Sequence, residues 1–345
     1  MGLVLTLFKV SILGSSVFVA SMLLTRTLII YSHKLGMIDN PNNRSSHTNP
    51  TPKGGGLAFF LVFSLVTLGL FIFFPKYHEI VLPLLLGGPI VVFLGWLDDR
   101  YTLPATPRLL VHFIVAISIY AFVTNWFTVP MGISFLPDWP FVNAAFCVLF
   151  IAWFINLYNF MDGADGLASS TAVAGSILMA AVSAIHGSIE LSVIYCLIAY
   201  TVSGFLFYNW SPAKIFMGDT GSYFLGFLFA SLALISKIQA NISFYSHIII
   251  FGFFIFDATY ILFRRALQRQ PLFQAHKTFL FHRLMEKGWS HRKVSSFYTM
   301  VLVLWLFPLS NLASIYDMFG LIIVIIAYLP LLIIAIYNEA GIVRE

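Results

Sequence analysis

The chain has little charge. Only 10% of its 345 residues are Asp, Glu, Lys or Arg, whereas 59% are hydrophobic, and the mean hydropathy is +0.90. Soluble domains carry about 25% charged residues, so this balance excludes an ordinary soluble protein. The composition predicts an all-α, polytopic integral membrane protein.

The sequence also lacks the motifs of several enzyme classes. It contains no HExxH, paired CxxC, Walker A or Rossmann glycine pattern, so zinc, ATP and nicotinamide chemistry have no support. Its two cysteines, Cys147 and Cys196, fall within apolar segments, where cysteine usually packs as a small hydrophobic residue. No internal repeat or low-complexity linker is visible, and we expect one domain over residues 1–345.

Apolar segments long enough to cross a bilayer recur along the chain. A crossing helix needs roughly 17 to 25 mostly apolar residues. About eleven spans are expected on this criterion, at residues 10–31, 56–74, 80–97, 109–127, 141–158, 168–186, 190–208, 221–236, 245–263, 296–313 and 318–337. The segment 221–236 is short and 296–313 contains Pro308, so ten spans is the alternative.

The positive residues predict the orientation of the chain. When successive loops are assigned to alternate sides, Lys9, Lys76 and Lys237 fall on one side and the remaining sixteen of the 19 Lys and Arg residues on the other. Cytoplasmic loops are enriched in Lys and Arg, so we expect the N-terminus outside and the C-terminus in the cytoplasm. The first span is too long for a signal peptide and is expected to be retained.

Two long polar stretches lie on the predicted cytoplasmic side. Residues 32–55 contain Pro41, Pro50 and Pro52 and lead into a run of glycines, which forbids a regular helix. Residues 264–295 hold eight Lys or Arg residues against a single acid, with apolar residues between them. This second stretch is typical of a segment that lies along a membrane surface.

Clustered acids in three cytoplasmic loops are the most distinctive feature. The first loop reads LDDR, where Asp98 and Asp99 end the third span and the helix dipole disfavours a carboxylate by about 0.3 to 1 kcal/mol. Neighbours on a helix point about 100° apart, so the two acids cannot face one point equally. We expect one to meet a metal or act as a base while the other organises the surroundings; a solvated helix end balanced by Arg100 is the alternative.

The second loop reads NLYNFMDGADGL, residues 156–167. A continuous helix would spread its Asn and Asp residues halfway round the cylinder. We therefore expect the helix to end near Asn159, with Asp162 and Asp165 in a tight turn shaped by glycine. Ordinary turn chemistry also favours these residue types.

The third loop reads FMGDTGS, residues 216–222. Asp219 precedes a span and is a candidate N-cap, together with Thr220 or Ser222. Phe216 is unusual beside a plain cap, and is a candidate to stack on a base while the acid holds a metal.

Carboxylates, glycine loops and basic residues on one membrane face suit chemistry between phosphates. Mg²⁺ takes one or two carboxylates plus phosphate oxygens, and phosphoryl transfer requires mainly positioning and charge stabilisation. His276, His282 and His291 share the basic loop, where contact with anionic lipid is the default. An apolar scaffold that opens at the interface would bring a lipid phosphate to a soluble nucleotide.

Several ordered motifs together resemble one enzyme family. They cover nearly the whole chain and read RSSHTNPTPKGGG (44–56), LDDR, NLYNFMDGADGL, FMGDTGSYFLG (216–226), AHKTFLFHRL (275–284) and GWSHRKV (288–294). With them the chain resembles the polyprenyl-phosphate N-acetylhexosamine-1-phosphate transferases, glycosyltransferase family 4. The first and last motifs look most like the branch that starts O-antigen or related surface glycans.

The resemblance implies a reaction and its partners. A sugar-1-phosphate would pass from a UDP-N-acetylhexosamine to undecaprenyl phosphate with release of UMP, and Mg²⁺, or Mn²⁺ in its place, would be the cofactor. The enzyme would lie in the lipid bilayer of a bacterial inner membrane with its site on the cytoplasmic face, and nucleic acid is not expected as a partner. The amino sugar stays open among GlcNAc, GalNAc, QuiNAc and FucNAc, and so does a homodimer.

The resemblance also implies catalytic roles. Asp219 would bind Mg²⁺, and Asp98 would be the candidate base with Asp99 supporting it. A lipid phosphate is already largely ionised near neutral pH, so the need for a true base stays open.

The substrates would meet a second group of residues. The residues implied in binding are Asn159, Asp162 and Asp165 in the nucleotide pocket, Phe216 against the uracil, and His276 and Arg108 on phosphates. The chain departs from the family at Phe279, where a second histidine is common, and whether His282 substitutes for it stays open.

Two other functions compete with this interpretation. A solute transporter would place ionisable residues near the bilayer midplane, but the main acid within a span, Asp257, lies only about 10 Å along its helix from Arg264. A non-catalytic family member would fit the departure at Phe279, yet every acidic motif residue is present.

Overall fold

The computed structural model describes residues 2–41, 49–124, 139–271 and 277–342, with side chains from residue 13 onward except that of Pro140. Nearly all of this chain is helical, which confirms the all-α prediction. The helices are α1 (Gly2–Leu35), α2 (Gly56–Phe73), α3 (His78–Tyr101), α4 (Ala105–Thr124), α5 (Pro140–Phe160), α6 (Leu167–Ile185), α7 (Ile189–Asn209), α8 (Gly218–Ala240), α9 (Phe244–Ile250), α10 (Gly252–Leu267), α11 (Leu280–Glu286), α12 (His291–Val301), α13 (Phe307–Ile315) and α14 (Gly320–Tyr337).

A small hairpin follows α1. The strands β1 (Ile38–Asp39) and β2 (Thr51–Pro52) pair antiparallel, with Ile38 opposite Pro52. The polar stretch 32–55 therefore begins as the last turn of α1, and its described residues include the two extended strands, in agreement with the prolines at and beside β2.

Ten described helices are long and apolar enough to cross a membrane, or eleven if α9 and α10 form one span. This confirms the expected count and a multi-pass membrane protein. The segment 221–236, which seemed short, belongs to the 23-residue helix α8.

The span expected at 245–263 is not one continuous helix. The chain bends by 77° between α9 and α10, at Phe251 and Gly252. A Cβ atom on Gly252 would lie 2.6 Å from the ring of Tyr328 in α14. Tertiary packing of α14 into this corner favours the break, which hydropathy does not reveal.

Pro308 modifies its span without ending it. α12 continues through a π-helical segment, Leu302–Leu306, into α13, where the proline occupies the first turn. Proline has no N–H to donate, and a π turn accommodates a locally altered hydrogen-bond pattern. The whole segment, His291–Ile315, remains one candidate span.

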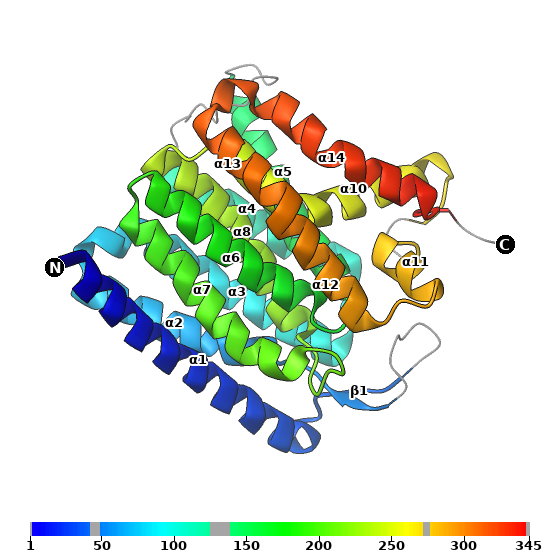
Figure 1. Cartoon of the computed structure of the whole chain (residues 1–345). Helices are drawn as coiled ribbons and strands as arrows, with labels where there is room; N and C mark the ends of the chain where they lie inside the picture. Colours follow the sequence, from blue (N-terminus) through cyan, green and yellow to red (C-terminus); the bar gives the residue numbers. More distant parts are fainter. Residues whose placement is uncertain (1, 42–48, 125–138, 272–276, 343–345) are drawn as a thin grey trace.

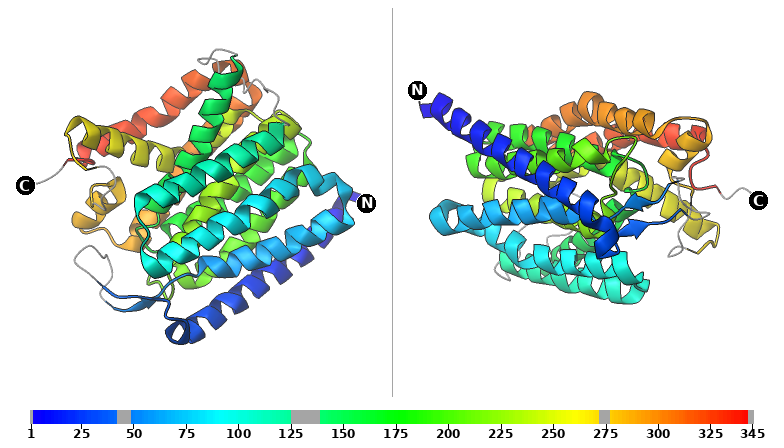
Figure 2. Two further views of the ribbon diagram at one scale, coloured as in Figure 1. Left: turned by 180° about the vertical axis from the view of Figure 1, so that it is seen from behind. Right: turned by 90° about the horizontal axis from the view of Figure 1, so that it is seen from below.

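α8 is the centre of the bundle. Its side chains from Thr220 to Ser236 are all buried, and it packs against α3 and α5. Figure 1 shows α1, α7 and α6 side by side, with α12 next to α6. Figure 2 shows the reverse side, where α3, α4 and α5 are neighbours.

The polar connections gather at one end of the bundle. The β1–β2 hairpin, α11 and the end of α14 lie at this end, and the start of α1 lies at the opposite end (Figure 1). This arrangement brings together the loops in which the sequence analysis places the catalytic residues.

Candidate active site

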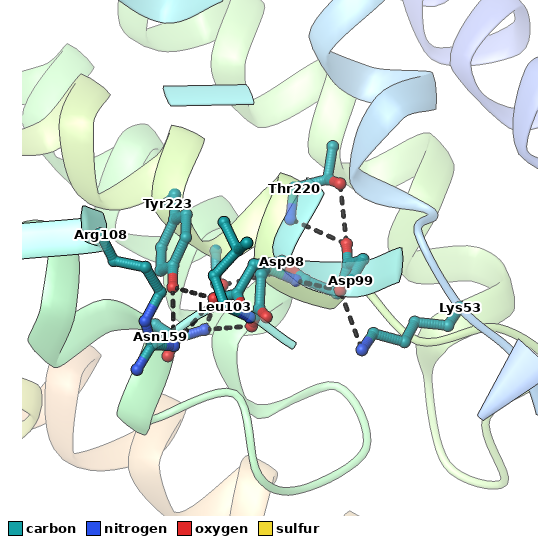
Figure 3. Close-up of polar contacts among 11 residues, drawn as sticks. Lys53, Asp98, Asp99, Leu103, Arg108, Asn159, Thr220 and Tyr223 are labelled. Carbon is teal, nitrogen blue, oxygen red and sulfur yellow. Dashed lines mark hydrogen bonds and ion pairs between the residues drawn. The ribbon is translucent and has the colours of Figure 1, made fainter. Parts of the chain in front are cut away.

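Asp98 and Asp99 at the end of α3 face different partners, as their angular offset predicts (Figure 3). Asp98 is buried; its Oδ1 accepts a hydrogen bond from the Leu103 N–H at 2.7 Å. Its Oδ2 accepts from Arg108 Nη1 at 2.8 Å and from the Tyr223 hydroxyl at 2.7 Å. The alternative of a solvated helix end is therefore wrong for Asp98.

Asp99 caps a different helix. Its Oδ1 accepts from the Asp219 N–H at 2.8 Å, and its Oδ2 accepts from the Thr220 N–H at 3.0 Å and the Thr220 hydroxyl at 2.7 Å. These backbone donors belong to the first turn of α8, where no intrahelical acceptor exists. Asp99 thus serves from α3 as the cap that α8 does not supply itself.

Gly218 makes this contact sterically feasible. Its φ is +74°, a conformation that residues with a Cβ rarely adopt. A Cβ on Gly218 would also lie 2.6 Å from Asp99 Oδ2.

Asp219 is not the N-cap of α8, the alternative that the sequence left open. It lies in the first turn of α8, whose N-cap is Met217. Its Oδ1 accepts from Asn159 Nδ2 at 2.6 Å, and the same amide donates to Ser222 Oγ at 3.0 Å. The end of α5 therefore meets the start of α8 at this carboxylate.

Lys53 is a site residue that the sequence analysis did not assign. Its Nζ lies 3.0 Å from Asp99 Oδ1. Burial opposes its charge, but Asp99 and Asp219 outweigh burial and raise the pKa of Lys53. The signal available in the sequence was a lone lysine directly before the glycines 54–56.

The glycine loop also fixes the backbone around Phe216. The Phe216 N–H donates to Pro52 O at 2.8 Å, and the Gly55 N–H donates to Phe216 O at 2.9 Å. The Phe216 side chain is partly exposed.

The loop after α5 carries the remaining acids. α5 ends at Phe160, as predicted, and Gly166 with φ +72° precedes α6. Burial and the neighbouring carboxylates of Asp219 and Asp99 raise the pKa of Asp162 well above its usual range. The raised pKa means that the surroundings of Asp162 disfavour its charged form.

Asp165 has a different set of partners. Its Oδ2 accepts from the Ala213 N–H at 3.1 Å. Nδ1 of His291 lies 3.1 Å from the Asp165 N–H, a bond it accepts when unprotonated, and 3.3 Å from Asp165 Oδ1, to which it donates when protonated. Burial opposes the charge of Asp165, but His291 and the Ala213 N–H outweigh it and lower the pKa of Asp165.

A second polar layer lies beneath Arg108. One turn along α4, His112 is buried with its Nδ1 3.0 Å from Asn156 Nδ2 and its ring against Tyr223. Tyr223 in turn donates to Asp98. The sequence analysis missed His112 and Tyr223, although each lies four residues from a predicted site residue, on the same helix face.

An apolar groove leads to this site. It has a volume of about 490 Å³ and runs between α4, α5 and α10. Its polar residues are Arg108, Asn156, Asn159 and Thr259, and the rest of its lining is apolar, including Phe113, Leu149, Trp153, Phe160 and Phe263. The apolar groove therefore leads to Arg108, the cation that pairs with Asp98.

The structure connects most of the predicted site residues. Contacts link Asp98 to Arg108, Asp99 to Asp219, and Asp219 to Asn159. His276 lies outside the described residues.

The acidic cluster fits a divalent cation. In the parts of the chain that the structure describes, no three Asp, Glu, His or Cys side chains form a complete metal cage. Mg²⁺ usually takes only one or two carboxylates, and its other ligands are water and phosphate oxygens. Asp162, whose charged form is disfavoured by burial and by neighbouring carboxylates, suits such an ion together with Asp219, because a bound cation would favour the ionised form of a carboxylate.

The fold and site define a polytopic membrane protein with a buried acidic centre at the end of an apolar groove. Residues 81–237 match the family model "Glycosyl transferase family 4". The chain is 33% identical to the probable undecaprenyl-phosphate N-acetylglucosaminyl 1-phosphate transferase of Bacillus subtilis, over 90% of this chain and 87% of that protein.

More distant relatives extend the comparison. The decaprenyl-phosphate N-acetylglucosaminephosphotransferase of Mycobacterium tuberculosis is 26% identical over 86% of this chain and 80% of its own. The phospho-N-acetylmuramoyl-pentapeptide-transferase of Staphylococcus epidermidis is 27% identical over 77% and 86%. The chain belongs to the polyprenyl-phosphate N-acetylhexosamine-1-phosphate transferases of glycosyltransferase family 4, and it is a phosphoglycosyltransferase.

Proposed function

We propose that the protein transfers an N-acetylhexosamine 1-phosphate from a UDP-sugar to undecaprenyl phosphate, and that the product starts a surface polysaccharide such as an O-antigen. An oxygen of the lipid phosphate attacks the β-phosphorus of the UDP-sugar. The bond between the β-phosphorus and the bridging oxygen breaks, and UMP leaves with that oxygen. The apolar groove that ends at Arg108, beside the buried acids, is the observation that carries this proposal.

The groove suits a long isoprenoid. Its lining by α4, α5 and α10 is largely apolar, while Arg108 and Asn159 lie at its polar end. A phosphate placed there meets the Arg108 guanidinium, a group that binds phosphate by charge and paired hydrogen bonds. Asp98 holds that guanidinium at 2.8 Å.

The UDP-sugar would bind on the side of the site where α8 begins. Asp162 and Asp219 provide carboxylates that suit Mg²⁺, which would neutralise the diphosphate when bound. Phe216, which is partly exposed and lies three residues before Asp219, would offer a ring for uracil. Lys53 adds a positive charge beside Asp99.

The orientation follows from the charge bias of the loops. UDP-sugars are soluble nucleotides, and the site lies at the end of the bundle that carries the basic stretch 264–295. The proposal therefore places this end in the cytoplasm of a bacterial inner membrane.

The direct test uses purified protein, undecaprenyl phosphate, Mg²⁺ and a panel of UDP-hexosamines, with UMP release as the readout. We expect release with at least one UDP-N-acetylhexosamine, and its loss when EDTA is present. Failure with the entire panel would contradict the proposed donor class.

A matched pair of variants tests the metal assignment. Asp219→Asn is expected to abolish Mg²⁺-dependent release while the protein stays folded. Asp317→Asn is the control, because Asp317 pairs with Lys237 near the other end of α8, about 27 Å along the helix axis from Asp219. Wild-type turnover by Asp219→Asn would exclude Asp219 as the ligand.

A further inference from the structure

A short segment, residues 277–290, packs against the acidic site. This segment, the arm, contains α11 and directly precedes α12. Phe281 lies against the Asp162–Asp165 loop, where a Cβ on Gly163 would come within 2.6 Å of its ring. Phe279 stacks on Phe160 at 6.1 Å, and Phe160 lines the groove.

The arm cannot hold this position by itself. α11 has seven residues, and isolated helices shorter than about 12 residues are marginal in water. Its placement therefore depends on anchors from other elements.

One anchor comes from inside the bundle. Asp257 in α10 is buried, and its Oδ1 accepts from the Leu280 N–H at 3.1 Å. Its Oδ2 accepts from the Tyr298 hydroxyl at 2.9 Å. This carboxylate ties the first residue of α11 to α10 and α12.

The second anchor is the C-terminal tail, residues 338–342. The Gly341 N–H donates to Thr278 O at 2.9 Å, and Lys287 Nζ donates to Asn338 Oδ1 at 2.8 Å. Arg283, also buried, donates from Nη2 to Ile342 O. The tail thus contacts the arm before, within and after α11.

The tail is itself fixed to α10. Arg264 Nη1 donates to Ala340 O at 2.8 Å, and Gln268 Nε2 donates to Gly341 O at 3.3 Å. Figure 1 shows the end of α14 beside α10 and α11. The tail therefore bridges the helix that lines the groove and the arm that meets the carboxylate loop.

We propose that the C-terminal tail is a positioning element of the active site, which sets the arm against the Asp162–Asp165 loop and the groove. This inference rests on the proposed function only for its catalytic readout. The tail touches no reacting group; it acts through Phe279 and Phe281.

The test compares the full-length protein with a truncation after Tyr337 and with Arg283→Gln. Arg269→Gln is the control, an exposed arginine at the end of α10 outside the tail contacts described above. Hydrogen exchange is measured for peptides covering residues 278–289 and 160–167, and kcat and KM are measured by UMP release. Arg283→Lys, which keeps one donor for the Ile342 carbonyl, is the conservative variant.

We expect faster exchange in both peptides for the truncation and for Arg283→Gln. Because positioning affects the reacting geometry more than substrate binding, kcat should fall about tenfold while KM changes by less than about twofold. Arg283→Lys should recover part of kcat, and Arg269→Gln should match the wild type.

The possible outcomes separate clearly. Unchanged exchange in 278–289, or faster exchange there with a wild-type kcat, would overturn the proposal. If the truncated protein does not fold, Arg283→Gln decides by the same criteria. If the wild type releases no UMP, the proposed function fails, and the exchange of 160–167 alone decides whether the tail controls the carboxylate loop.

Discussion

Replacing Asp99 by alanine should destabilise the protein by removing the cap of its central helix. The substitution leaves the Asp219 N–H, the Thr220 N–H and the Thr220 hydroxyl without their acceptor. Thr220 is fully buried, so water does not readily replace the lost carboxylate.

The magnitude follows from counting these bonds. Each intramolecular hydrogen bond contributes about 1 kcal/mol net, and a lost N-cap alone costs about 0.5 to 2 kcal/mol. Three bonds to one carboxylate therefore give about 3 kcal/mol for Asp99→Ala. The ion pair with Lys53 adds little, because the lysine side chain is 27% exposed and solvent screens the charge.

A double-mutant cycle in detergent micelles measures the effect. The free energy of unfolding is determined for the wild type, Asp99→Ala, Thr220→Val and the double variant. Because Thr220 donates to Asp99 at 2.7 Å, the two losses should overlap by about 1 kcal/mol.

Activity provides the second readout. Asp99→Ala should also lower turnover, since the cap fixes the backbone N–H of Asp219 itself. Strictly additive losses in the cycle, or wild-type stability of Asp99→Ala with activity lost, would refute capping and return Asp99 to a direct catalytic role.

Three further predictions concern individual residues of the site. Asp98→Asn should reduce kcat by about 100-fold if Asp98 acts as a base, and full turnover across pH would exclude that role. Phe216→Ala should raise KM for the UDP-sugar about tenfold, because stacking on a base is worth about 1 to 3 kcal/mol; an equal rise in KM for the lipid would exclude stacking. Gly218→Ala should destabilise the protein by about 1 to 3 kcal/mol, because φ is +74° there, and an unchanged unfolding free energy would contradict the strain.

The sequence predicted the spans well because hydropathy reports directly on bilayer crossing. It also predicted the end of α5 and the divergent directions of Asp98 and Asp99, because both follow from helix geometry and glycine placement. It failed at Gly252, where the bend between α9 and α10 is favoured by the packing of Tyr328.

The site itself was only partly predictable. The motifs identified the acids and the family resemblance implied Arg108, but the capping of α8 by Asp99 joins residues 120 positions apart. The same holds for two other contacts. Lys53, directly before the glycine loop, pairs with Asp99, and Tyr223 on α8 donates to Asp98 on α3.

By itself, the sequence determined that this is a multi-pass helical membrane protein with acidic loops, because composition, periodicity and turn chemistry are local properties. Only the tertiary structure decided which acid pairs with the arginine of the groove, which one caps a helix, and what holds α11 in place. Those roles depend on hydrogen bonds between distant segments, whose partners are chosen when the helices pack.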